Sequence, residues 1–176
     1  LIIQGKKMKL WKIKKFWISS YLVLVFMFIT GFSFAADSSK VGSKYIEMSK
    51  GNNNAPVVFV EYASLTCPAC AAFHKNVFPK LNKEYVETGK IKFIHREIYF
   101  DRAGLWAALT ARCTNVVNRY FGMLDLLYSE QQMWSRSESN DEIVNALLKI
   151  SAKSGIEKEK AISCLEDQEK ALELVN

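Results

Sequence analysis

Histidine and paired cysteines are scarce in this 176-residue chain, and their scarcity excludes several kinds of site. There are two histidines, His74 and His95, and one Cys-x-x-Cys pair, Cys67 and Cys70. A zinc site needs about four ligands, usually two such pairs or added histidines. The other two of the four cysteines stand far apart in the sequence. We therefore expect no metal site, and we expect no cofactor.

Acidic residues are absent from the first 36 positions, and this absence changes the meaning of the net charge of +6. Six lysines fall between Lys6 and Lys15, and the remainder of the chain carries 18 basic and 18 acidic residues. The body of the protein is therefore neutral. We expect no nucleic acid or other polyanion as a partner.

An uncharged run from Phe16 to Ala36 follows the lysines and ends in small residues. A basic start, an apolar run and small residues are typical of an export signal, here over residues 1–36. Because about 18 apolar residues can span a bilayer, an uncleaved inner-membrane anchor is the alternative. The preceding lysines place the N-terminus in the cytoplasm, so both interpretations predict a periplasmic or secreted domain.

The rest of the chain divides by pattern into a polar segment, an α/β part and a helical part. Residues 37–54 are polar and rich in Gly, Ser and Asn. In residues 55–100, the apolar run Val57–Tyr62 predicts a central parallel strand covered on both faces, and Ile91–Ile98 predicts a second strand. Between them a helix begins at Pro68, and Pro79 should kink it. This order favours an α/β fold in which the two strands are parallel.

Residues 101–176 are helical by pattern. We expect helices over Ala103–Val117 and Arg119–Met133. The run Ser139–Glu142 has the spacing of a capping box that opens a third helix, and Gly155 should end that helix. Glu157–Val175 predicts a fourth helix, rich in charged residues.

Cys67 and Cys70 stand where the first helix should begin, and this position favours redox chemistry. Unpaired backbone N–H groups and the positive end of the helix dipole favour the thiolate of Cys67. Cys67 is then the attacking sulfur, and Cys70, one turn further along, is the resolving thiol. A lowered pKa also stabilises the reduced pair, which makes the disulfide more oxidising. A pair of inert buried thiols is the alternative, and Pro68 at the first helical position of an exported chain disfavours it.

Glu61, His74 and the remaining cysteines each allow two interpretations. A carboxylate is costly in a buried strand, so Glu61 either relays a proton to or from Cys70 or is solvated at the strand end. His74 lies on the apolar stripe of the helix, which favours a satisfied core histidine over a catalytic one. Cys113 and Cys164 either form a structural disulfide that closes a loop of about 50 residues or remain free buried thiols.

The stretch Ala55–His74, with Cys67-Pro68-Ala69-Cys70 inside it, resembles DsbA-family thiol:disulfide oxidoreductases of the alphaproteobacterial type. Further similarities lie in Val77–Leu81, Tyr85–Lys90, Arg96-Glu97, Ala111–Cys113 and Ser163–Leu165. The resemblance covers essentially all of the chain after the signal, and it implies a thioredoxin-like fold with an inserted helical domain. It also implies that Cys67 accepts electrons from a substrate dithiol and that Cys70 resolves the mixed disulfide. Members of this branch resemble the chain in a second cysteine pair.

The chain departs from the family pattern in three places. Ala69 replaces the usual histidine between the two cysteines, so we expect a less oxidising centre. Tyr99 stands where the family usually has a proline. The chain ends at Asn176, and we expect it to lack the C-terminal strands and the cis-proline loop of the family, as a fragment or an early-terminated gene product would.

Together these features predict an exported thiol:disulfide oxidoreductase that forms disulfides in unfolded exported proteins by dithiol–disulfide exchange through Cys67. The resemblance implies a membrane quinone-linked thiol oxidase as the reoxidant. Two alternatives stay open. One is a disulfide reductase or isomerase with the same chemistry, and the other is a truncated, secreted chain that binds polypeptide or has no enzymatic role.

Overall fold

The computed structural model describes residues 46–176, which form a small sheet and many helices. The strands are β1 (Met48–Lys50), β2 (Val57–Ala63) and β3 (Ile91–Glu97), in the order β1-β3-β2. β3 pairs in parallel with β2 over all seven residues of each strand, and antiparallel with β1. The mixed α/β class and the parallel pair predicted from the sequence are confirmed.

Three helical elements connect β2 to β3: α2 (Pro68–Asn76), α3 (Phe78–Leu81) and the π-helical turn η1 (Asn82–Val86). Pro68 lies at the start of α2, where the N–H that it lacks would have no partner. Helix α2 ends before Pro79, because this residue has no N–H to donate to the preceding turn. The kink predicted at Pro79 is therefore found as a break.

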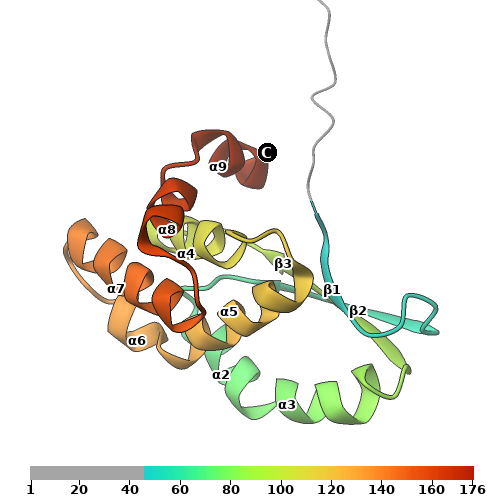
Figure 1. The fold of residues 1–176 in the computed structure, drawn as a ribbon. Helices are drawn as coiled ribbons and strands as arrows, with labels where there is room; N and C mark the ends of the chain where they lie inside the picture. Colours follow the sequence, from blue (N-terminus) through green and yellow to red (C-terminus); the bar gives the residue numbers. More distant parts are fainter. Residues whose placement is uncertain (1–45) are drawn as a thin grey trace, which may run out of the picture. The chain divides into compact units, whose positions relative to one another are not determined.

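The helical part follows β3, and Figure 1 shows most of its helices gathered on one side of the sheet. Its elements are α4 (Arg102–Ala111), α5 (Val117–Ser129), α6 (Gln131–Trp134), α7 (Asn140–Lys153), α8 (Lys158–Leu165) and α9 (Gln168–Val175). The single helix predicted over Glu157–Val175 is wrong. It is divided because the Asp167 side chain accepts a hydrogen bond from the N–H of Lys170 and starts a new helix there.

The capping box predicted at the start of α7 does not form. The helix begins after Ser139, but the Ser139 side chain makes no capping hydrogen bond. The carboxylate of Glu142 accepts instead from the hydroxyl of Ser137. The predicted end of the helix is correct, since Gly155 has φ +75°, a conformation that glycine adopts without strain.

Among the described residues the central strand is β3, whereas Val57–Tyr62, predicted as a central strand covered on both faces, has a partner on one side only. Within residues 46–176, β2 pairs only with β3 and so lies at the edge of the sheet. Val58 and Tyr62 are 56% and 59% exposed, whereas Phe93 in β3 is fully buried. An apolar β-branched run identifies a strand, but pairing with segments distant in the sequence decides its position.

The core lies between the sheet and the helical part, and large side chains fill it. Those with no exposed surface include Phe93, Tyr120, Leu124, Leu127 and Trp134. Burying an aromatic or aliphatic side chain of this size contributes roughly 1.5–3 kcal/mol. These contacts anchor the helical part to β3, and so they fix the position of everything attached to either one.

A disulfide joins Cys113, just after α4, to Cys164 in α8, with the two Cα atoms 5.5 Å apart. It closes a loop that contains α5, α6 and α7. No helix between residues 46 and 176 is long and apolar enough to cross a bilayer. The predicted export signal lies outside the described residues.

Candidate functional site

Two side chains from the helical part hold the loop between β2 and α2. The hydroxyl of Thr66 donates to Oδ2 of Asp101 at 2.7 Å. From α6, the buried amide of Gln131 donates to the carbonyl oxygens of Leu65 at 2.8 Å and Cys67 at 2.9 Å. The loop that ends in the first cysteine is therefore fixed from two directions.

Cys67 is the N-cap of α2, and both it and Cys70 are free thiols. Burial acts to raise the pKa of the Cys67 thiol. The backbone N–H of Cys70, the Cys70 thiol and the backbone N–H of Ala69 act in the opposite direction, and the resulting pKa lies below the ordinary value. The helix N-terminus therefore favours the thiolate at Cys67, as the sequence predicts.

Cys70 has the opposite electrostatic environment. Burial raises the pKa of its thiol most, the Cys67 sulfur and the Glu61 carboxylate raise it further, and the pKa reaches about 11. At neutral pH the pair is therefore asymmetric, with a nucleophilic sulfur at Cys67 and a protonated thiol at Cys70. Pro68 and Ala69 lie between them, exposed at the surface.

Glu61 is not solvated at the end of its strand. Its side chain is 11% exposed, and its Oε2 lies 2.9 Å from Nε2 of His74, whose side chain is 3% exposed. The imidazole of His74 stacks on the ring of Tyr128, with centroids 4.2 Å apart. Nδ1 of His74 is buried and has no hydrogen-bond partner among the described residues. His74 is therefore buried, as predicted, but only one of its two ring nitrogens is satisfied.

A second buried polar group begins at His95, in the middle of β3. Nδ1 of His95 lies 2.6 Å from the hydroxyl of Tyr120, which donates to Oε1 of Glu97 at 2.9 Å. Nε and one terminal nitrogen of Arg112 donate to the two oxygens of Glu97, each at 2.7 Å. The charges of this buried Arg112–Glu97 pair are thereby matched, as burial requires.

The proton positions in this group follow from the donors. Tyr120 has one hydroxyl proton and donates it to Glu97, so the Nδ1–H of His95 must donate to the Tyr120 oxygen. Burial, the largest cause, lowers the pKa of His95 to about 4, so its ring is neutral at pH 7. Nε2 of His95 therefore carries a lone pair, which faces the hydroxyl of Tyr128 at 3.5 Å.

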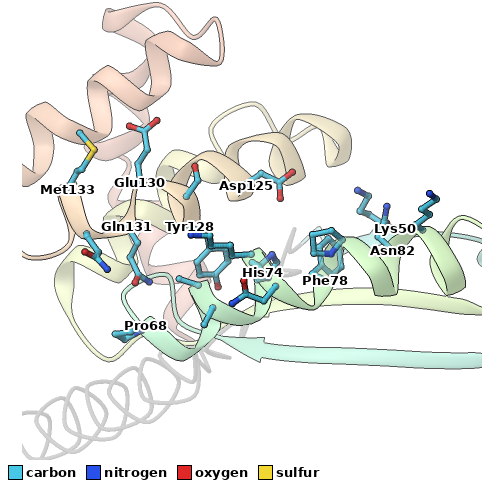
Figure 2. Close-up of a pocket in the computed structure, with 18 of the residues that line it drawn as sticks. Lys50, Pro68, His74, Phe78, Asn82, Asp125, Tyr128, Glu130, Gln131 and Met133 are labelled. Carbon is cyan, nitrogen blue, oxygen red and sulfur yellow. The ribbon is translucent and has the colours of Figure 1, made fainter.

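A groove of about 1060 Å³ runs along α2, from the redox motif to the far end of α3 (Figure 2). Figure 2 shows Pro68 and Met133 at one end, His74 and Tyr128 along its wall, and Lys50 at the other end. Met133 is 74% exposed, whereas the His74 ring in the wall of the groove is almost fully buried.

Several of these residues were not found by sequence reasoning. His95 and Tyr120 each lie beside apolar residues, and a core position is the simplest interpretation of both. Gln131 has no local pattern that marks it, because its partners lie more than 60 positions away. Asp101 caps α4 by accepting from the N–H of Gly104, but its contact with Thr66 joins residues 35 positions apart. The structure brings together Glu61, His74 and the two cysteines of α2, whereas Cys113 and Cys164 form their disulfide in the helical part.

A model of the thioredoxin family matches residues 43–176, which is most of the chain. The chain belongs to the thioredoxin family. It is 35% identical over 121 residues to a Rickettsia bellii protein named as a candidate protein-disulfide oxidoreductase. This alignment covers 69% of the chain and 46% of the relative.

Solved structures give the same family and fold. The crystal structure of Wolbachia pipientis alpha-DsbA1 matches with a TM-score of 0.69 and 32% identity, over 74% of the chain and 64% of that protein. The structure of oxidised BdbD from Bacillus subtilis matches with a TM-score of 0.63, over 73% of the chain and 70% of that protein. At 21% identity, the second match supports the fold alone. The thioredoxin-like, DsbA-type fold expected from the sequence is confirmed.

The chain spans about half the length of the curated relative that it matches. The activities in the relatives' names therefore belong to longer proteins, of which this chain matches only a part. The activity of the chain itself has to be argued from its own site.

Proposed function

We propose that the chain is a thiol:disulfide oxidoreductase that acts through Cys67. The observation that supports this most is the asymmetry of the two cysteines in one helical turn. Cys67 has a lowered pKa and Cys70 a pKa of about 11, within a thioredoxin-like fold. Metal ligands or inert core thiols would not need an attacking and a protonated sulfur side by side.

In the oxidising direction, a substrate thiolate attacks the Cys67 sulfur of the Cys67–Cys70 disulfide. The S–S bond breaks, and Cys70 leaves as a thiolate that takes up a proton. A second substrate thiolate then attacks the substrate sulfur of the mixed disulfide and releases Cys67 as a thiolate. The substrate gains a disulfide, and the Cys67–Cys70 pair gains two electrons. The low pKa of Cys67 makes it the better leaving group in this second step.

Glu61 is proposed as the residue that exchanges a proton with Cys70. Its charge raises the pKa of the Cys70 thiol, and it is held by His74 with little exposure to water. A carboxylate with little exposure and one fixed partner suits a proton relay. His74 is then a positioning residue that orients Glu61. Pro68 and Ala69 set the geometry of the motif, and the Cys113–Cys164 disulfide has a structural role.

The substrates proposed are unfolded exported proteins, and the proposed location is the periplasm or the outside of the cell. A membrane quinone-linked thiol oxidase would reoxidise the pair. The exposed Pro68 and Ala69 next to Cys67 support a polypeptide substrate, because they leave the sulfur open to an extended chain. No nucleic acid is proposed as a partner, since the charge of the body is balanced.

A trapping experiment tests the proposal. The full chain with Cys70→Ser, mixed with a substrate protein that carries an activated disulfide, should accumulate a mixed disulfide through Cys67, because no resolving thiol remains. The same chain with Cys67→Ser should form none. If neither the Cys70→Ser chain nor the oxidised wild-type chain forms a Cys67-dependent mixed disulfide, the proposal is wrong.

The direction of the reaction is tested separately. Equilibration of the Cys67–Cys70 pair with glutathione, followed by quantification of the oxidised fraction, gives its reduction potential. An oxidising value supports disulfide formation, although Ala69 should make the pair less oxidising than one with histidine there. A strongly reducing value would assign the chain to the reductases instead.

A further inference from the structure

Three donor groups lie together at α2, two of them buried and one partly buried, and each comes from a different element. They are the Glu61 carboxylate in β2, the His74 imidazole in α2 and the His95 imidazole in β3. One ligand atom from each lies within 4.8 Å of the other two. From this arrangement we propose that Glu61, His74 and His95 form a binding site for a divalent cation of the zinc type.

The distances suit a small cation with tetrahedral coordination. Zinc binds histidine nitrogen and carboxylate oxygen at about 2.0–2.2 Å, so ligand atoms around it lie about 3.3–3.6 Å apart. The Glu61 oxygen and Nε2 of His74 are already 2.9 Å apart, and no pair of ligand atoms exceeds 4.8 Å. Side-chain adjustments of about an ångström would bring all three around one ion. Two imidazoles and a carboxylate are a ligand set typical of zinc, with a fourth position open to water.

The partners of His95 support a ligand role. Histidine ligands almost always donate their other ring N–H to a fixed acceptor, which sets the tautomer and the direction of the ring. Here the Nδ1–H donates to Tyr120, which is held by the Glu97–Arg112 pair. The lone pair on Nε2 is therefore presented by a rigid chain of hydrogen bonds, and only the distant hydroxyl of Tyr128 faces it.

In His74 the ligand atom is Nε2, which lies 2.9 Å from the Glu61 oxygen and would exchange this contact for the ion. The ring of His74 also contributes to the wall of the groove along α2 (Figure 2). The Glu61 carboxylate supplies one negative charge toward the ion.

The site was not expected from the sequence, because one Cys-x-x-Cys pair and two histidines were too few for the four ligands that a zinc site usually has. The proposed site uses no cysteine. Because Glu61 is also the proposed proton partner of Cys70, a bound cation and proton transfer through Glu61 exclude each other.

The test uses the full chain with Cys67→Ser and Cys70→Ser, so that no free thiol can bind metal. Its outcome then does not depend on whether the chain exchanges disulfides. Titration with Co²⁺ should give one bound ion per chain with the visible absorption of a four- or five-coordinate site, and Zn²⁺ should displace it. Adding Glu61→Gln, which can still pair with His74, or His74→Gln should weaken binding at least about 10-fold.

Glu130→Gln is the matched control, because Glu130 lines the same groove but binds Lys153. It should leave the affinity for Co²⁺ unchanged. Circular dichroism checks folding, and if His74→Gln does not fold, Glu61→Gln decides alone. Absence of the cobalt absorption, unchanged affinity in Glu61→Gln, or an equal loss in Glu130→Gln would overturn the proposal.

Discussion

Replacing Gln131 should weaken the hold of the helical part on the redox loop, and the structure sets the size of the effect. In Gln131→Met the side chain keeps its length and loses both donors. The Leu65 carbonyl then loses its donor from α6, and a buried acceptor left unsatisfied costs about 1–3 kcal/mol. The Cys67 carbonyl keeps the N–H of Ala71, so losing its second donor costs only about 1 kcal/mol. We expect the free energy of unfolding to fall by about 2–4 kcal/mol.

The same substitution should change the chemistry of Cys67. With the loop less constrained, the sulfur spends less time facing the N–H groups at the start of α2, and its pKa should rise toward the ordinary value. Urea denaturation measures the stability, and the ultraviolet absorbance of the thiolate against pH measures the pKa. Gln132→Met is the matched control, because Gln132 is the exposed neighbour on the same helix. Equal stability losses in the two variants, or an unchanged Cys67 pKa in Gln131→Met, would refute the reasoning.

Three further predictions follow from other contacts. Arg112→Met should lower the free energy of unfolding by about 3–5 kcal/mol, because it strands a buried carboxylate; a loss no larger than that of a surface substitution in urea denaturation would contradict this. Joint replacement of Cys113 and Cys164 by serine should cost about 4 kcal/mol for a separation of 51 residues, and an unchanged urea midpoint would argue against it. Alkylation followed by mass spectrometry should modify Cys67 at a pH below that of an ordinary thiol, whereas Cys70 should react only near pH 11. Identical pH profiles for the two thiols would show that the asymmetry is absent.

The start of the redox helix could be predicted because its causes are local. A proline suits the first turn, and the cysteine before it then takes the N-cap position. The break before Pro79 has an equally local cause, since proline removes one donor from the preceding turn. Neither feature depends on residues elsewhere in the chain.

The position of β2 could not be predicted in the same way. The apolar residues of Val57–Tyr62 predict a buried strand, yet several of them are exposed at the edge of the described sheet. The partners of a strand are chosen by segments far away in the sequence, and no periodicity reports them. The division of Glu157–Val175 had a local cause, the capping side chain of Asp167, but the charged pattern concealed it.

The candidate site could be predicted only in part, because some of its residues are close in the sequence and others are not. The two cysteines of α2 and Glu61 lie within ten residues of one another, so their pattern is visible. His95 and Tyr120 belong to the polar group because β3 and α5 pack together, and in the sequence they look like core. A buried polar network has no spacing of its own, because packing between distant elements assembles it.

The two hydrogen-bonded contacts that hold the redox loop bear on the order of events during synthesis. Thr66 and Asp101 are 35 positions apart, and Cys67 and Gln131 are 64 apart. A nascent chain that has not yet been synthesised as far as α6 contains the complete Cys-Pro-Ala-Cys motif. It still lacks the hydrogen bonds that Gln131 donates to the redox loop. We therefore expect the loop that carries Cys67 to become fully constrained only after α6 has been synthesised and has packed against it.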